Sequence, residues 1–185
     1  MNPPNTSREE IMRVSRKIVS EKGLPALNMR ALAKECGIAL GTLYNYYSDK
    51  DELVVAAIES VWQDILEKSA PDSGVRFSQY VTQIYARILS GLKDYPDFFA
   101  AHSISVAGSA KGKARGTMER CFGKIRSELH AALREDKNVD RSIFSETFRE
   151  EDLIEHILDT ITISIINGKP DCTVLTEILD RLLYR

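Results

Sequence analysis

The sequence predicts an all-α protein with two domains, and three observations support this fold class. Apolar residues recur three and four positions apart over most of the chain, as they do on one face of an α-helix. Glycine and proline are sparse, at 10 and 6 of 185 residues, which disfavours a turn-rich β protein. Residues typical of helix ends flank most of the apolar stretches. Together these features predict nine helices and no strand.

The first helix is expected over residues 7–22. Thr6 or Ser7 can cap its N-terminus, and Gly23 is suited to end it. Asn28 can cap the second helix in the same way. The other eight helices are expected at residues 29–36, 40–46, 50–69, 75–94, 96–108, 114–135, 146–167 and 171–184.

Two of these assignments rest on more than the apolar period. Ser48 is an N-cap candidate for the fourth helix, and Asp51 at the third helical position comes close to a capping box. Residues 161–166 (ITISII) are β-branched and are locally typical of a strand. The cap signals and the helical period on either side nevertheless predict that this run belongs to the eighth helix.

Composition excludes several classes of protein. Hydrophobic residues make up 43% and charged residues 28% of the chain, which is ordinary for a globular protein. No apolar run approaches the ~18 residues of a membrane-spanning helix, and the N-terminus lacks the pattern of a secretory signal. The three cysteines lie far apart and show no zinc-ligand spacing. We therefore expect a cytoplasmic protein with reduced cysteines, no membrane association, no metal and no cofactor.

Charge is distributed unevenly along the chain. Residues 1–50 hold eight Lys and Arg against five acidic residues, so this part carries +3 and the other 135 residues carry −5. A basic N-terminal part suggests an anionic partner, although an excess of this size is common.

Residues 29–48 (MRALAKECGIALGTLYNYYS) have the layout of a helix-turn-helix. Two helices that cross steeply need a small residue at their contact, which Ala33 provides, and a glycine in the turn, which Gly37 provides. The apolar positions of the motif are Leu32, Cys36, Ile38 and Leu43. A generic pair of packed helices would show only two or three of these features.

This stretch resembles the tetracycline-repressor (TetR) family of bacterial transcription regulators. The likeness covers residues 29–54 and extends to Lys22, Gly23 and Asn28 before them. It implies a three-helix DNA-binding domain over residues 1–48, followed by a six-helix ligand-binding and dimerisation domain over residues 49–185. Leu40, Asn45 and Tyr47 depart from the residues common in the family, which bears on base preference and not on the fold.

The third helix would enter the major groove of double-stranded DNA, with a phosphate at Lys50 beside the N-terminus of the fourth helix. Tyr44 and Tyr46 are assigned to DNA by the resemblance, Tyr46 as a phosphate contact, whereas Tyr47 is expected in the core. Simple packing for Tyr44 and a solvated side chain for Arg30 are the alternatives. The full predicted DNA-binding set is Asn28, Arg30, Leu40, Gly41, Thr42, Tyr44, Asn45, Tyr46 and Lys50.

The second domain is expected to bind a mostly apolar small molecule, with His102 as the polar group that orients it. A filled core is the alternative, and a basic cluster over residues 111–126 would instead suit an anionic ligand. The predicted lining is Trp62, Tyr80, Ile84, Phe99, His102, Met118 and Phe122.

A homodimer is expected through the eighth and ninth helices, because each has more apolar positions than one packed face needs. The predicted interface is Ile154, Ile157, Leu158, Ile161, Ile165, Ile178, Leu179 and Leu182. No catalytic motif is present, and His156 with Asp152 and Asp159 is interpreted as a solvated helix face.

These patterns predict a repressor that a small-molecule effector releases from a palindromic operator. The rival from another class is a helical small-molecule-binding protein or enzyme with a fortuitous N-terminal helical corner. A regulator whose effector is a partner protein is a second alternative.

Overall fold

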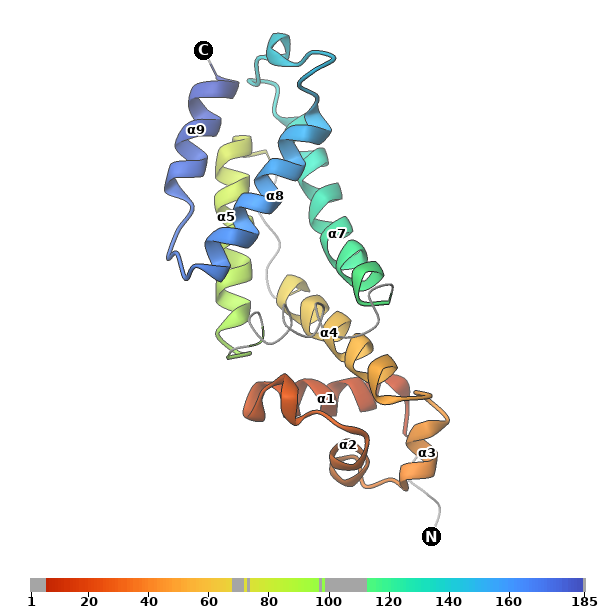
Figure 1. Cartoon of the computed structure of the whole chain (residues 1–185). Coiled ribbons are helices and arrows are strands. Elements are labelled where there is room, and N and C mark those ends of the chain that lie inside the picture. Colours follow the sequence, from red (N-terminus) through yellow and green to blue (C-terminus); the bar gives the residue numbers. More distant parts are fainter. Residues whose placement is uncertain (1–5, 68–71, 73, 97, 99–112, 185) are drawn as a thin grey trace. The chain divides into compact units, whose positions relative to one another are not determined.

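The structure, a computed structural model, describes residues 6–67, 72, 74–96, 98 and 113–184, and within these the side chains of residues 113–121 are left out. All regular structure in these ranges is helical, which confirms the predicted fold class (Figure 1). The α-helices are α1 (Arg8–Lys22), α2 (Met29–Glu35), α3 (Leu40–Tyr44), α4 (Lys50–Glu67), α5 (Phe77–Leu92), α7 (Lys113–Glu135), α8 (Glu150–Ile166) and α9 (Thr173–Leu183). Two short 3-10 helices cover Leu24–Ala26 and Arg141–Ile143.

Most predicted helices are present with small shifts at their ends. The β-branched run at residues 161–166 is helical, as expected, and closes α8. This helix begins at Glu150 and not at residue 146, because Ser145 pairs with Phe148 through its backbone and the rings of Phe144 and Phe148 stack 5.8 Å apart. The helix predicted at residues 96–108 lies almost entirely outside the described residues.

The described residues group into two compact units that do not follow the chain in order. Of the described residues, those within 1–65 and 91–119 form the first unit, and those within 66–90 and 120–185 form the second. The domain boundary expected at residue 48 stays a prediction.

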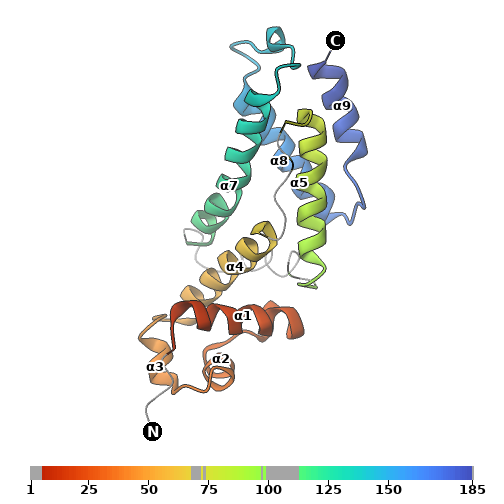
Figure 2. The ribbon, with the colours of Figure 1, turned by 180° about the vertical axis from the view of Figure 1, so that it is seen from behind.

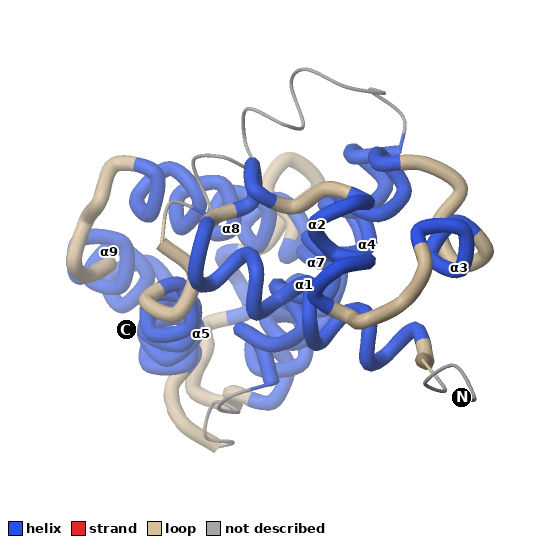
Figure 3. Tube along the Cα trace, turned by 90° about the horizontal axis from the view of Figure 1, so that it is seen from below, coloured by secondary structure: helices blue, strands red, loops and turns tan. Residues whose placement is uncertain are grey.

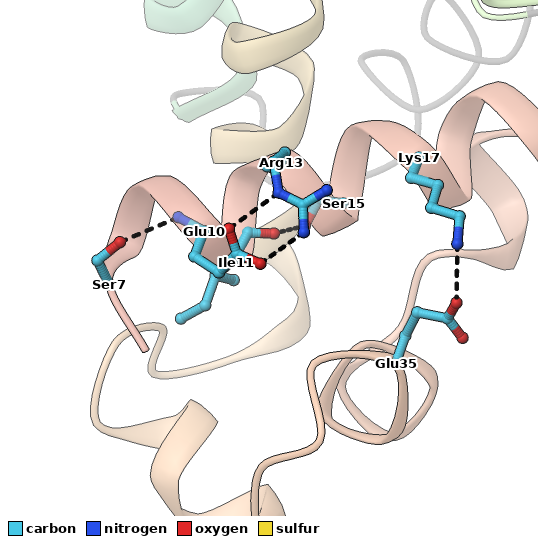
Figure 4. A network of polar contacts seen from close by, with 7 residues as sticks. All are labelled: Ser7, Glu10, Ile11, Arg13, Ser15, Lys17 and Glu35. Carbon is cyan, nitrogen blue, oxygen red and sulfur yellow. Dashed lines mark hydrogen bonds and ion pairs between the residues drawn. The ribbon is translucent and has the colours of Figure 1, made fainter. Parts of the chain in front are cut away.

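In the first unit, α1 begins and ends as its sequence predicts. The Ser7 side chain accepts a hydrogen bond from the Glu10 backbone N–H at 3.1 Å, and the Gly23 N–H closes the helix on Val19 O. Lys17 on α1 forms an ion pair with Glu35 of α2 at 3.5 Å (Figure 4). Exposed pairs of this kind contribute little stability, so the apolar side chains that α1 buries provide most of its attachment.

Polar and aromatic contacts join α4 to α1 and to the segment that follows α5. Arg16 of α1 donates to the Ser60 hydroxyl, and Tyr95 donates to an oxygen of Asp64 at 2.8 Å. Trp62 is 1% exposed and contacts the edge of Phe98, with 6.2 Å between ring centroids. These contacts fix one long helix against both α1 and the segment that follows α5.

In the second unit, buried Asp136 at the end of α7 gathers three donors. The Phe77 N–H at the start of α5 and the Tyr184 hydroxyl both reach Oδ2, at 2.9 and 2.6 Å, and the Asn138 N–H reaches Oδ1. Burial alone would raise the pKa of Asp136, but these hydrogen bonds outweigh it and hold the pKa below its usual range. In both ribbon views α7 and α8 lie side by side (Figures 1 and 2).

Candidate nucleic-acid interface

The turn between α2 and α3 has the geometry that the sequence predicts. Gly37 adopts φ 65°, a left-handed conformation that favours glycine. The Ile38 N–H donates to Ala33 O at 3.0 Å and the Gly37 N–H to Lys34 O at 3.2 Å, which together end α2 in a Schellman motif. Figure 3 shows the loops that lead into and out of α3. The turn therefore forms as a helix-turn-helix requires.

The short helix α3 has one buried face and one open face. Leu43 is fully buried and Tyr47, just after the helix, is 2% exposed, which confirms its expected place in the core. On the other side Tyr44 is 49% exposed, and Gly41 and Asn45 are also exposed. Leu40 and Thr42 are half-buried. An exposed tyrosine beside a glycine is the kind of surface that contacts base edges and phosphates.

Gly41 has no evident role within the chain. Its φ is not positive, and apart from adjacent residues and the backbone of α3 itself, no described atom lies within 4 Å of the place where a Cβ would stand. A glycine inside a helix destabilises it by roughly 0.5–1 kcal/mol relative to alanine. The open space above Gly41 is consistent with the close approach of another molecule.

Several predicted DNA-binding residues also have partners within the chain. Asn28 caps α2, because its side-chain oxygen accepts from the Ala31 N–H at 2.9 Å, and its amide donates to Ala26 O. The Tyr46 hydroxyl donates to Thr6 O, so this proton is not available to a phosphate. Arg30 is exposed at the start of α2.

The N-cap predicted for α4 is wrong by one residue. The cap is Asp49 and not Ser48, because an Asp49 carboxylate oxygen accepts the Glu52 N–H at 2.7 Å. Glu52 in turn accepts from the Ser48 N–H and hydroxyl, which lowers the pKa of Glu52. Lys50 is exposed beside these carboxylates, so acids already balance the helix dipole here.

Sequence reasoning missed Arg8, the first residue of α1. Its guanidinium donates to Tyr46 O at 2.8 Å and lies over the Tyr47 ring, 5.1 Å from the centroid. The partners are 38 and 39 residues away in sequence, so no local pattern signals the contact.

Residues 11–57 match the profile of the family described as bacterial regulatory proteins, tetR family. This match spans 47 of the 185 residues and includes the helix-turn-helix. An HTH-type transcriptional regulator of Haemophilus influenzae is 33% identical over 99 residues, which cover 47% of this chain and 53% of that protein. The regulator UidR of Escherichia coli is 32% identical over 78 residues, or 42% of this chain and 40% of that protein. The chain thus spans about half the length of these relatives or less.

Two solved structures share the fold of nearly the whole chain. BioQ, crystallised with its double-stranded DNA operator, has a TM-score of 0.68 at 16% identity and covers 96% of this chain and 98% of its own. EbrR, a multidrug-binding protein crystallised with proflavin, has a TM-score of 0.64 at 16% identity and covers 95% and 98%. At this identity the likeness concerns the fold.

The dimer interface expected from the sequence needs correction. Five of the eight residues, Ile154, Ile157, Leu158, Ile161 and Leu179, are buried within the single chain, so they form its core. Ile165 is half-buried, whereas Ile178 and Leu182 are 56% and 38% exposed. The other exposed apolar residues of α8 and α9 are Ile163, Ile166 and Val174. Between α8 and α9 lies a groove of about 560 Å³ that includes Val174, Ile178 and Leu182.

The predicted ligand-binding residues are only partly described. Trp62 and Ile84 are buried in their respective units, and Tyr80 and Phe122 are half-buried. Phe99 and His102 lie outside the described residues, as does the side chain of Met118. Tyr80 also lines a groove of about 710 Å³ in the second unit, with Arg76, Glu128 and Glu135. The predicted apolar pocket stays a prediction.

Within the described part of the chain, none of the helices is both long and apolar enough to cross a membrane. The described side chains also include no cluster of three or more His, Cys, Asp and Glu that could hold a metal ion.

Proposed function

We propose that this protein is a transcriptional regulator that reads double-stranded DNA with α3. The observation that carries the proposal is the open face of α3, where Tyr44 is half-exposed and Gly41 faces empty space. Neither residue is part of the buried core, and both lie on the second helix of a helix-turn-helix. That helix is the one that enters the major groove in proteins with this motif. BioQ, which has the same fold, was crystallised on its operator.

A binding site selected from a randomised duplex library allows a direct test. Thr42→Ala combined with Tyr44→Ala should abolish sequence-specific binding and leave the helical content unchanged. Lys50→Ala should weaken binding to all sequences and reduce the slope of log K against log salt by about one. Lys137→Ala, at an exposed lysine after α7, is the charge-matched control and should leave both quantities unchanged. Wild-type affinity in the double variant would disprove the role of α3.

The regulator acts as a homodimer in this proposal, and the exposed apolar residues of α8 and α9 form the interface. Large exposed side chains such as Val174 (76%) and Ile178 (56%) beside a groove favour coverage by another chain. A two-fold dimer would place two α3 helices about one DNA turn apart, on a palindromic operator. Sedimentation should give about twice the chain mass of 20.8 kDa. Ile178→Glu should give a folded monomer, whereas Lys93→Glu, at an exposed lysine after α5, should leave the dimer intact.

The effector in this proposal is a small molecule that binds the C-terminal domain and releases the protein from DNA. EbrR, which shares the fold, was crystallised with proflavin. The effector acts by its different affinity for the DNA-competent and DNA-incompetent conformations. A panel of apolar and anionic compounds can be screened by melting temperature and by the emission of buried Trp62. Responses to anionic compounds alone, unaffected by His102→Ala, would favour the basic cluster over the apolar pocket.

The relatives in these comparisons are regulators and not enzymes, so we assign no catalytic activity to the chain. Its place of action would be the cytoplasm, where its DNA target lies. If no selected duplex gives a gel shift, the alternative of a helical small-molecule-binding protein or enzyme is favoured instead.

A further inference from the structure

The C-terminal end of α3 is tied to the start of α1 by two hydrogen bonds that run in opposite directions. Arg8 Nη2 donates to the backbone oxygen of Tyr46 at 2.8 Å. The hydroxyl of the same Tyr46 donates to the backbone oxygen of Thr6. These residues are 38 and 40 positions apart in sequence, so the contacts fix one element against another.

The Arg8 guanidinium makes a second contact at the same place. It lies over the ring of buried Tyr47, with 5.1 Å from its carbon to the ring centroid. A cation over an aromatic face is attracted to it, and a planar guanidinium can stack there while it donates in its own plane. A lysine could keep the charge but could not reproduce this combination.

A helix as short as α3 depends on such contacts for its orientation. It has five residues, far fewer than the number at which a helix is stable by itself in water. Its N-terminal end follows the Schellman turn at Gly37, and Leu43 anchors its middle in the core. The segment after α3 is held by Tyr47 in the core and by the contacts with Arg8 and Thr6.

We propose that Arg8 and Tyr46 are positioning residues that hold α3 in the orientation that reads DNA. This inference rests on the proposed DNA-binding function and revises the role that the sequence suggested for Tyr46. The Tyr46 hydroxyl acts on α1 and not on a phosphate, and Arg8 acts through Tyr46 and Tyr47 and not as a cation next to the DNA backbone.

Arg8→Lys separates positioning from phosphate contact, because it keeps the charge and removes the planar group. For a positioning residue, affinity for the selected site falls about tenfold, which equals about 1.4 kcal/mol. Affinity for an unrelated duplex of the same length and the slope of log K against log salt stay as in the wild type. Arg13→Lys, an exposed arginine on the same helix that pairs with Glu10, is the matched control and leaves both affinities unchanged.

Tyr46→Phe is a milder variant that removes only the hydroxyl. It should lower specific affinity about two- to tenfold and spare non-specific affinity. When it is combined with Arg8→Lys, the loss should differ from the product of the single losses, because both variants act on one contact. A melting curve for each variant reports whether the domain is folded.

Three results would overturn the proposal. One is wild-type affinity in Arg8→Lys together with a salt slope reduced by about one in Arg8→Ala, which would make Arg8 a phosphate contact. Another is an equal loss of specific and non-specific affinity in Tyr46→Phe, which would make that hydroxyl a phosphate contact. If the wild-type protein selects no duplex, the DNA-binding function itself fails, which is a distinct result.

Discussion

Gly41→Ala is expected to change stability and DNA binding in opposite directions. In the free protein the new methyl group meets no described atom within 4 Å, and it replaces a residue that is unfavourable in a helix. The gain in the free energy of unfolding should be roughly 0.5–1 kcal/mol. For a chain of this size, that corresponds to a rise of about 1–4 °C in melting temperature.

On DNA the same methyl group should be harmful. If α3 lies in the major groove with Gly41 against the duplex, the Cβ occupies space that a base edge or phosphate needs. Overpacking of a close-fitting contact costs about 1–3 kcal/mol. At about 1.4 kcal/mol for each tenfold change, the affinity for the selected site should fall about 5- to 150-fold.

Gly123→Ala provides the matched control for this experiment. Gly123 lies inside α7, and no described atom lies within 4 Å of its Cβ position either. This variant should also raise the melting temperature but leave DNA affinity unchanged. Melting curves and gel shifts on both variants give the comparison. A Gly41→Ala variant that binds DNA as tightly as the wild type would refute the placement of α3 against the duplex.

Three further predictions concern stability. Gly91→Ala should lower the melting temperature, since its Cβ would stand 2.6 Å from Cγ2 of Ile65, a stiff β-branched side chain, and cost about 1–3 kcal/mol. Asp136→Asn should lower the free energy of unfolding by about 1–3 kcal/mol at neutral pH. The difference from the wild type should shrink below about pH 4, because the pKa of Asp136 is lowered in the folded state and its carboxylate stops stabilising the fold as pH falls through that value. Unfolding series at decreasing pH measure this. Tyr95→Phe should lower the free energy of unfolding in urea by about 1–3 kcal/mol, because it removes the hydroxyl that donates to Asp64. For each of the three variants, an unchanged unfolding midpoint would contradict the contact that the variant tests.

Local signals in the sequence located helix ends well. Ser7, Asn28 and Gly37 each act where expected, because a cap or a turn involves residues only a few positions apart. The predicted cap of α4 is wrong by one position. Ser48 and Asp49 are both good cap residues, and only the backbone geometry decides between them.

The apolar period could not reveal what covers each side of a helix. Ile154 and Ile157 were expected at a dimer interface, but both are fully buried within their own chain. The exposed side of α8 instead carries Ile163 and Ile166, each 57% exposed. A period of 3.6 residues identifies a face, and the partner of that face depends on the tertiary fold. The contact between Arg8 and Tyr46 was unpredictable for the same reason.

Residues that break a local rule become informative once the structure shows whether the chain itself has a reason for them. The chain requires glycine at position 37 because its φ is positive, and at position 91 because Ile65 leaves no room for a side chain. Gly41 and Gly123 have neither a positive φ nor a described neighbour that would exclude a side chain. Gly41, however, lies three residues before Tyr44, a half-exposed aromatic residue that the core does not use. Both residues lie on the open face of α3, and the proposed function assigns them to a molecule outside the chain. The contrast between the alanine variants of Gly41 and Gly123 tests that assignment.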